Sequence, residues 1–150
     1  MMGPSVDEAL ELIRQLRMLN QIQNAARTRF WNDEFGLHPA AGALLADVVA
    51  RGEVRVSDLA EHRVVDTSVV SRQIAQLEKV GLVERRPSPS DGRVALISPT
   101  ERGREVLAGW KQKQAELIRA AFAEWDDGRL AAANGVLREL IASLRTSLEA

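Results

Sequence analysis

Hydrophobic residues recur every three or four positions over several long stretches of the chain, which is the spacing of one face of an α-helix. The first such stretch covers residues 6–35 and stops near Gly36; its apolar positions are Val6, Leu10, Ile13, Leu16, Leu19, Ile22, Ala26 and Phe30. A helix of about thirty residues is longer than a small domain needs. We therefore expect part of its apolar face to pack against a second copy of the chain.

A second helix is predicted over residues 40–51, with Pro39 at or just before its first turn and Gly52 as its stop. Its buried residues are expected to be Leu44, Leu45 and Val48.

The C-terminal third of the chain predicts two more helices. Thr100 is placed to cap a helix that runs to about Trp125, and Asp126-Asp127-Gly128 interrupts it. The last helix covers residues 129–148, with apolar positions Leu130, Leu137, Leu140, Ile141, Leu144 and Leu148. Because this stripe follows a complete domain, we expect it to pack against another helix.

Two short helices are predicted in the middle of the chain. Residues 54–56 indicate a very short strand, Ser57 is placed to cap a helix over residues 58–63, and Asp66 to cap a helix that ends at Gly81. Two helices joined within three or four residues form a helix-turn-helix. Turns of this kind often hold glycine, whereas this one holds the β-branched Val64 and Val65.

A β-hairpin is predicted after Gly81. Residues 82–86 and 93–98 are rich in strand-forming residues, and residues 87–92 between them are rich in Pro, Ser, Asp and Gly. Prolines stiffen this loop and deny it ladder hydrogen bonds, so we expect it to project as a finger.

The helix over residues 66–81 has one apolar and one polar face. Val70, Ile74 and Leu77 form the apolar stripe. The opposite face carries Ser68, Arg72, Ala75 and Lys79, with Ser71 and Gln76 at its margins. Small and polar residues with cations suit the floor of a DNA major groove, although these residues alone fit an ordinary solvated helix equally well.

The overall composition is that of an ordinary soluble protein. Of 150 residues, 45% are hydrophobic and 27% charged, no apolar run approaches a membrane span, and no signal sequence opens the chain, which predicts a cytoplasmic location and no membrane partner. The formal net charge is −1, but residues 51–104 carry ten cations and eight anions. The basic part is therefore the part that contains the predicted helix-turn-helix and hairpin.

The residue types present argue against enzymatic chemistry. The chain has no cysteine, so disulfides and thiolate metal sites are excluded, and its two histidines, His38 and His62, are too far apart in sequence to suggest a metal cluster. It also lacks a glycine-rich phosphate loop and a convincing pair of carboxylates. We expect no enzyme activity, no metal and no cofactor.

The order of these motifs resembles that of the multiple antibiotic resistance regulator (MarR) family of bacterial winged-helix repressors. The most specific part is residues 91–103, DGRVALISPTERG, which is similar to the wing signature of that family; Ser71-Arg72, Leu77-Glu78 and Gly81-Leu82-Val83 add to the match. Arg63 and Val64 stand where the family usually has Leu-Gly, and Pro99 where a Leu often precedes the Thr.

The resemblance implies a mainly α fold with a small β-hairpin, in one domain over residues 1–150. The winged helix-turn-helix would cover about residues 37–104, and dimerisation helices about residues 5–35 and 105–148. The protein would be a homodimeric transcriptional regulator, a repressor that binds a palindromic double-stranded DNA operator with half-sites about 34–36 Å apart. A small aromatic or phenolic effector would release it. A winged helix that binds an acidic protein partner instead of DNA is the alternative.

The resemblance also implies residue roles. The predicted DNA-binding residues are Thr67, Ser68, Ser71, Arg72, Gln76, Arg85, Arg86, Asp91 and Arg93. Ser68 and Gln76 would read bases, Thr67 and Arg72 would bind phosphates, Arg93 would enter the minor groove with Asp91 orienting its guanidinium, and Arg85 and Arg86 would reach flanking phosphates.

Each of these roles has a structural alternative. Arg72 can pair with Glu78, Arg85 and Arg86 can be edge-strand charges that deter aggregation, and Asp91 is a common turn residue. The candidate effector-binding residues are Trp31, Phe35, His38 and Trp110, although aromatic residues at helical spacing are typical of plain core.

Overall fold

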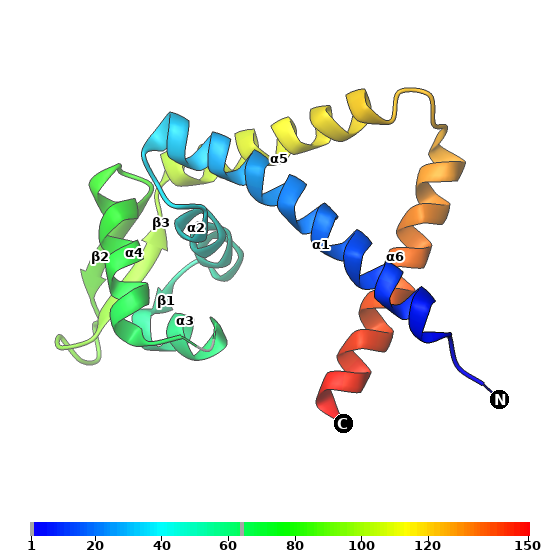
Figure 1. Ribbon diagram of the computed structural model, residues 1–150. Coiled ribbons are helices and arrows are strands. Elements are labelled where there is room, and N and C mark those ends of the chain that lie inside the picture. Colours follow the sequence, from blue (N-terminus) through cyan, green and yellow to red (C-terminus); the bar gives the residue numbers. More distant parts are fainter. Residues whose placement is uncertain (1, 64) are drawn as a thin grey trace. The chain divides into compact units, whose positions relative to one another are not determined.

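The computed structural model describes residues 2–63 and 65–150, and Figure 1 shows its helices and strands. These residues form two compact units, Met1–Trp110 and Lys111–Ala150. The elements of the first unit, in chain order, are α1 (Val6–Thr28), the π-helical turn η1 (Arg29–Asp33), α2 (Pro39–Arg51), β1 (Val54–Arg55), α3 (Val56–Arg63), α4 (Thr67–Lys79), β2 (Val83–Pro87), β3 (Ala95–Pro99) and the start of α5 (Glu101–Ala121). The second unit holds the rest of α5 and α6 (Asp127–Glu149).

The first predicted helix is confirmed over its predicted length, but it is not a regular α-helix throughout. A π-helical turn, η1, follows α1, and the chain leaves the helix at Gly36, which has a φ of +65°. The wider turn brings two consecutive side chains, Phe30 and Trp31, into the core, and Trp31 is only 1% exposed.

Helix α2 follows the sequence prediction closely. It begins at Pro39, and the His38 side chain caps it, since its Nδ1 accepts a hydrogen bond from the Ala40 N–H at 3.0 Å. Gly52 ends it with a φ of +83°. Leu44, Leu45 and Val48 are fully buried, as predicted.

The caps of the next two helices differ from the prediction. Strand β1 stops at Arg55 and α3 already begins at Val56, so Ser57 lies inside the first turn and is not the cap. Asp66 does precede α4, but its side chain makes no capping bond; its backbone carbonyl accepts from Val69 and Val70 instead. Val64 lies outside the described residues.

The predicted hairpin is confirmed and gains a third strand. The antiparallel sheet has the order β1-β3-β2, with Val54 paired to Ile97 and Arg86 paired to Leu96. Pro99 ends β3, and Thr100 then joins the hairpin to α5. Its N–H donates to the Leu82 carbonyl at 3.1 Å and its hydroxyl donates to the Gly81 carbonyl at 2.6 Å, while that hydroxyl oxygen accepts from the Gly103 N–H.

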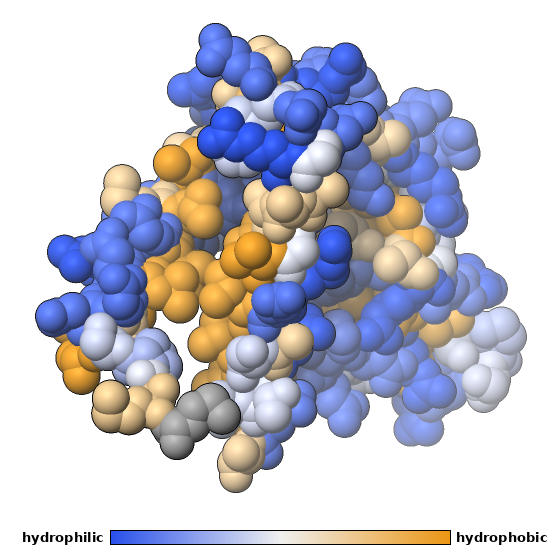
Figure 2. All heavy atoms as spheres, turned by 90° about the vertical axis from the view of Figure 1, so that its right-hand side faces the viewer, coloured by the Kyte–Doolittle hydropathy of each residue, from blue (hydrophilic) through white to orange (hydrophobic). Residues whose placement is uncertain are grey.

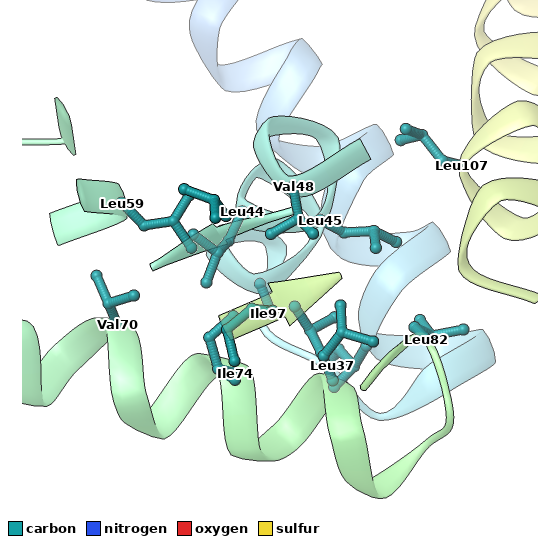
Figure 3. Packing of buried hydrophobic residues seen from close by; sticks show 14 of the residues in the cluster. Leu37, Leu44, Leu45, Val48, Leu59, Val70, Ile74, Leu82, Ile97 and Leu107 are labelled. Atoms are coloured by element: carbon teal, nitrogen blue, oxygen red, sulfur yellow. The ribbon is translucent and has the colours of Figure 1, made fainter. Parts of the chain in front are cut away.

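The core of the first unit is formed by α2, α4 and the sheet. Figure 3 shows Val70 and Ile74 of α4 facing Leu44 and Val48 of α2. The fully buried side chains include Leu44, Leu45, Val48, Leu59, Val70, Ile74, Leu77, Leu82 and Ile97. The predicted apolar face of α4 is therefore the face that is buried.

The C-terminal helices have shifted boundaries. Helix α5 ends at Ala121 and not near Trp125, and α6 begins at Asp127 because the Asp126 carboxylate accepts a hydrogen bond from the Arg129 N–H at 2.8 Å. Trp125 lies between them, edge-on to Phe122 and under the Arg129 guanidinium. In the described part of the chain, no helix combines the length and apolar character needed to cross a bilayer.

Gly42 of α2 allows a close contact with the buried Trp31. A Cβ at this position would overlap the indole ring, and that ring already packs among Phe30, Phe35 and Trp110. We expect Gly42→Ala to lower the free energy of unfolding by about 1–3 kcal/mol, the usual cost of overpacking a core.

Urea unfolding at one fixed protein concentration measures this effect. Gly109→Ala is the matched control, because Gly109 lies in α5 with open space around its Cα; it should stabilise the chain by about 0.5–1 kcal/mol. Equal stability of Gly42→Ala and the wild type would contradict the tight packing.

Candidate nucleic-acid interface

Helix α4 exposes the face that the sequence predicted to be polar. Thr67, Ser68, Arg72 and Gln76 are exposed and Ser71 is half-buried. The opposite stripe packs into the core, so the helix cannot rotate about its axis without exposing buried apolar surface.

Arg72 does not pair with Glu78. Within residues 2–63 and 65–150, Arg72 forms no ion pair, and the Glu78 carboxylate lies 3.9 Å from Arg85 instead. The structure thus leaves the Arg72 guanidinium available to a partner outside the chain.

The loop between β2 and β3, which we call the wing (residues 88–94), presents an arginine at the surface. The Asp91 carboxylate accepts hydrogen bonds from both the Arg93 N–H (3.1 Å) and the Arg93 Nε (3.3 Å), while the Arg93 side chain remains 93% exposed. Backbone bonds from Ser88 to Val94 and from Val94 to Asp91 close the loop. The wing therefore holds a preformed arginine tip.

Arg85 and Arg86 point to opposite faces of the sheet, as consecutive strand residues do. Arg85 is paired with the inward-facing Ile97 and reaches Glu78 of α4. Arg86 lies on the outer face, where both its Nε (2.7 Å) and its Nη2 (2.6 Å) donate to the Glu53 carboxylate.

This bidentate pair shifts the titration of both groups. The hydrogen bond from Arg86 holds the pKa of the Glu53 carboxyl below its ordinary value, and the same hydrogen bond raises the pKa of the Arg86 guanidinium. Both groups are thus held in their charged forms.

The polar face of α4 and the wing lie in the same unit. The chain turns at residues 80–82, so β2 runs back along α4 and carries the wing toward the end at which α4 begins (Figure 1). This brings the predicted major-groove helix and the arginine tip to neighbouring positions.

Two ion pairs near the site were not predicted from the sequence. Glu53 and Arg86 are separated by 33 residues, and Arg63 and Asp47, which form a half-buried pair at 2.6 Å, by 16. Arg63 is one of the departures from the family pattern, and its bond to Asp47 ties the end of α3 to α2. No local motif signals contacts at such separations.

The aromatic candidates for effector binding pack against each other. Ring centroids of Trp31 and Phe35 are 5.8 Å apart, those of Trp31 and Trp110 are 6.2 Å apart, and Phe30 lies among them. His38 instead lines a cleft of about 470 Å³, whose other lining residues are Asn24, Thr28, Asn32 and Pro39.

Comparison with known proteins gives a consistent result. The model of the MarR family matches residues 37–95. The chain is 40% identical over 82 residues to the uncharacterized HTH-type transcriptional regulator YxaD of Bacillus subtilis, which covers 55% of this chain and 57% of YxaD. It is 30% identical over 115 residues to the uncharacterized HTH-type transcriptional regulator Mb0904 of Mycobacterium bovis, covering 77% of this chain and 75% of that protein.

A third relative is named as a repressor. The HTH-type transcriptional repressor MdtR of Bacillus subtilis is 34% identical over 87 residues, covering 55% of this chain and 56% of MdtR. This chain thus spans somewhat more than half the length of YxaD and MdtR. All three relatives are named as regulators of transcription, in agreement with the prediction that the chain is not an enzyme.

The fold is also that of a solved regulator. The crystal structure of a mutant MarR from E. coli, complexed with operator DNA, superimposes with a TM-score of 0.67 at 20% identity, covering 92% of this chain and 99% of that one. This likeness confirms the winged-helix fold predicted from the sequence. The match to the family model and the similarity to the mycobacterial protein over three quarters of its length establish that the chain belongs to the MarR family of HTH-type transcriptional regulators.

Proposed function

We propose that the protein is a homodimeric repressor that binds a specific sequence of double-stranded DNA. The observation that carries this proposal is the combination, in one unit, of an α4 whose polar face is exposed and an arginine-tipped wing beside it. E. coli MarR, which shares this fold, has been crystallised with operator DNA, and the relative MdtR is named as a repressor.

The exposed residues of α4 suit the two tasks of a recognition helix. Gln76 can make paired hydrogen bonds to an adenine edge, and Ser68 can donate to or accept from a base. Thr67 and Arg72 lie where they can bind phosphates, which fix the register of the helix without reading sequence. Arg93 fits a narrow minor groove, because A·T-rich DNA concentrates negative potential there.

Unburied apolar side chains support the homodimer. Helices α1 and α6 bury no residue within the chain. The large hydrophobic residues exposed on them include Val6, Leu10, Ile13, Leu19, Ile22, Val136, Leu137, Ile141, Leu144 and Leu148. Figure 2 shows hydrophobic side chains at the molecular surface among hydrophilic ones. Apolar surface of this extent is typical of a protein interface, and a symmetric dimer matches a palindromic operator.

We further propose that a small effector releases the protein from DNA by binding in the cleft beside His38. The cleft volume of about 470 Å³ is in the range of small-molecule sites. Trp31, Phe35 and Trp110 form the packed aromatic cluster of the same unit but are not among the residues that line this cleft. An effector that prefers the non-binding arrangement a hundredfold shifts the equilibrium by roughly 2.7 kcal/mol.

Selection of bound sequences from random duplex DNA tests the proposed function. We expect a palindromic site, and binding that weakens by about 10³-fold or more between 50 and 200 mM salt, because each neutralised phosphate releases counterions. If no duplex binds at low salt, the protein is not a DNA-binding regulator, and binding of an acidic protein partner becomes the better assignment.

Arg93→Ala tests the wing. Removing a direct DNA contact of about 1–3 kcal/mol should weaken operator binding about tenfold or more, measured by fluorescence anisotropy. The side chain is almost fully exposed, so the melting temperature should not change. Arg104→Ala removes the same charge from an exposed position on α5 and should change affinity less than about twofold. An affinity of Arg93→Ala within twofold of wild type would remove Arg93 from the interface.

Ile141→Glu tests the dimer. A carboxylate placed on the apolar stripe of α6 would be buried without a partner, so we expect monomers at micromolar concentration by sedimentation. Ser143→Glu adds the same charge to an exposed polar position two residues away and should leave the dimer intact. If both variants remain dimers, the dimer interface does not include the apolar stripe of α6.

A further inference from the structure

The Glu53–Arg86 ion pair joins the two outer strands of the sheet. Strands β1 and β2 are not neighbours, because β3 lies between them. Leu96 of β3 is paired with Arg55 on one side and with Arg86 on the other, and Glu53 directly precedes β1. The two hydrogen bonds at 2.7 and 2.6 Å therefore span β3 on the outer face of the sheet.

This bond lies at the root of the wing. Arg86 is followed by Pro87, the last residue of β2, whose partner Ala95 begins β3. The nitrogen of Pro87 faces away from β3, because the ladder continues at the next residue, where the Ser88 N–H donates to the Val94 carbonyl at 2.8 Å. Proline therefore removes no bond between β2 and β3 at this position. On its outer edge β2 has no neighbouring strand in the described part of the chain. The Glu53 carboxylate thus gives β2 a second attachment, across β3 and in addition to the ladder, where the wing begins.

We propose that Glu53 and Arg86 are positioning residues for DNA binding: their bidentate bond fixes the direction of the wing and thereby places Arg93. This inference rests on the proposed function. It replaces the sequence-based expectation that Arg86 binds a flanking phosphate, because two donors of its guanidinium are already engaged by a carboxylate that neutralises its charge.

The two roles of Arg86 predict effects of opposite sign. If Arg86 were a phosphate ligand restrained by Glu53, removing the Glu53 carboxylate would free a cation and remove an anion, and DNA affinity would rise. If the pair positions the wing, the same substitution loosens the wing and affinity falls, although the chain has become more positive.

The first test is operator affinity of Glu53→Ala, measured on the intact protein by fluorescence anisotropy. We expect affinity to fall about three- to tenfold, with the fold retained because the pair is exposed. Glu84→Ala is the matched control: it removes a carboxylate from an exposed position on β2, the strand of Arg86, but breaks neither hydrogen bond to Arg86. Its affinity should equal or slightly exceed that of wild type.

The second test asks whether the effect passes through Arg93. In an Arg93→Ala background, Glu53→Ala should change affinity less than about twofold, because the group being positioned is gone. Arg86→Lys keeps the charge but loses the planar fork, so it should resemble Glu53→Ala. Thermal unfolding of each variant checks that the fold is intact.

Three outcomes would overturn the proposal. The first is a DNA affinity of Glu53→Ala above that of wild type. The second is an equal loss of affinity on Glu53→Ala whether or not the Arg93 side chain is present. The third is wild-type affinity of both single variants, Arg86→Lys and Glu53→Ala. None of these three outcomes contradicts the proposed DNA-binding function, as long as the wild-type protein binds its operator. Absence of wild-type binding would instead refute the proposed function itself.

Discussion

Burial of one face of α4 is the constraint on which the rest of the structure depends. Val70, Ile74 and Leu77 are fully buried against α2 and the sheet, and each such side chain contributes about 1.5–3 kcal/mol. This burial determines which residues remain outside. The exposed arrangement of Ser68, Arg72 and Gln76 is thus a consequence of core packing, and it needs no stabilising contacts of its own.

A second set of contacts joins the hairpin to the helices. The Thr100 hydroxyl bonds to the Gly81 carbonyl and accepts from Gly103, and Gly103 lies so close to the Leu82 carbonyl that a side chain there would overlap it. The ends of β2 and β3 are therefore fixed to the first turn of α5. The wing extends from a rigid base, and its own loop bonds, together with the Glu53–Arg86 pair, restrain the rest.

The distribution of charge explains how a chain with a net charge of −1 fits a DNA-binding function. Glu53, Asp47 and Glu78 pair with Arg86, Arg63 and Arg85 around the sheet and α2. Arg72 and Arg93 stand exposed on α4 and the wing. Three arginines near the site are thus paired within the fold, whereas the Arg93 side chain stays exposed beside Asp91. The local arrangement of charge matters more to association than the total charge.

The sequence by itself determined the elements whose causes are local. Apolar spacing predicted the buried face of α4, glycine and proline predicted the ends of α2, and a turn-rich loop predicted the hairpin, because each depends on residues within a turn or two. The tertiary structure decided the π-helical turn that buries Phe30 with Trp31, the start of α3 before Ser57 and the pairing of Arg86 with Glu53. These features depend on neighbours distant in sequence, whose approach is set by packing of the whole unit.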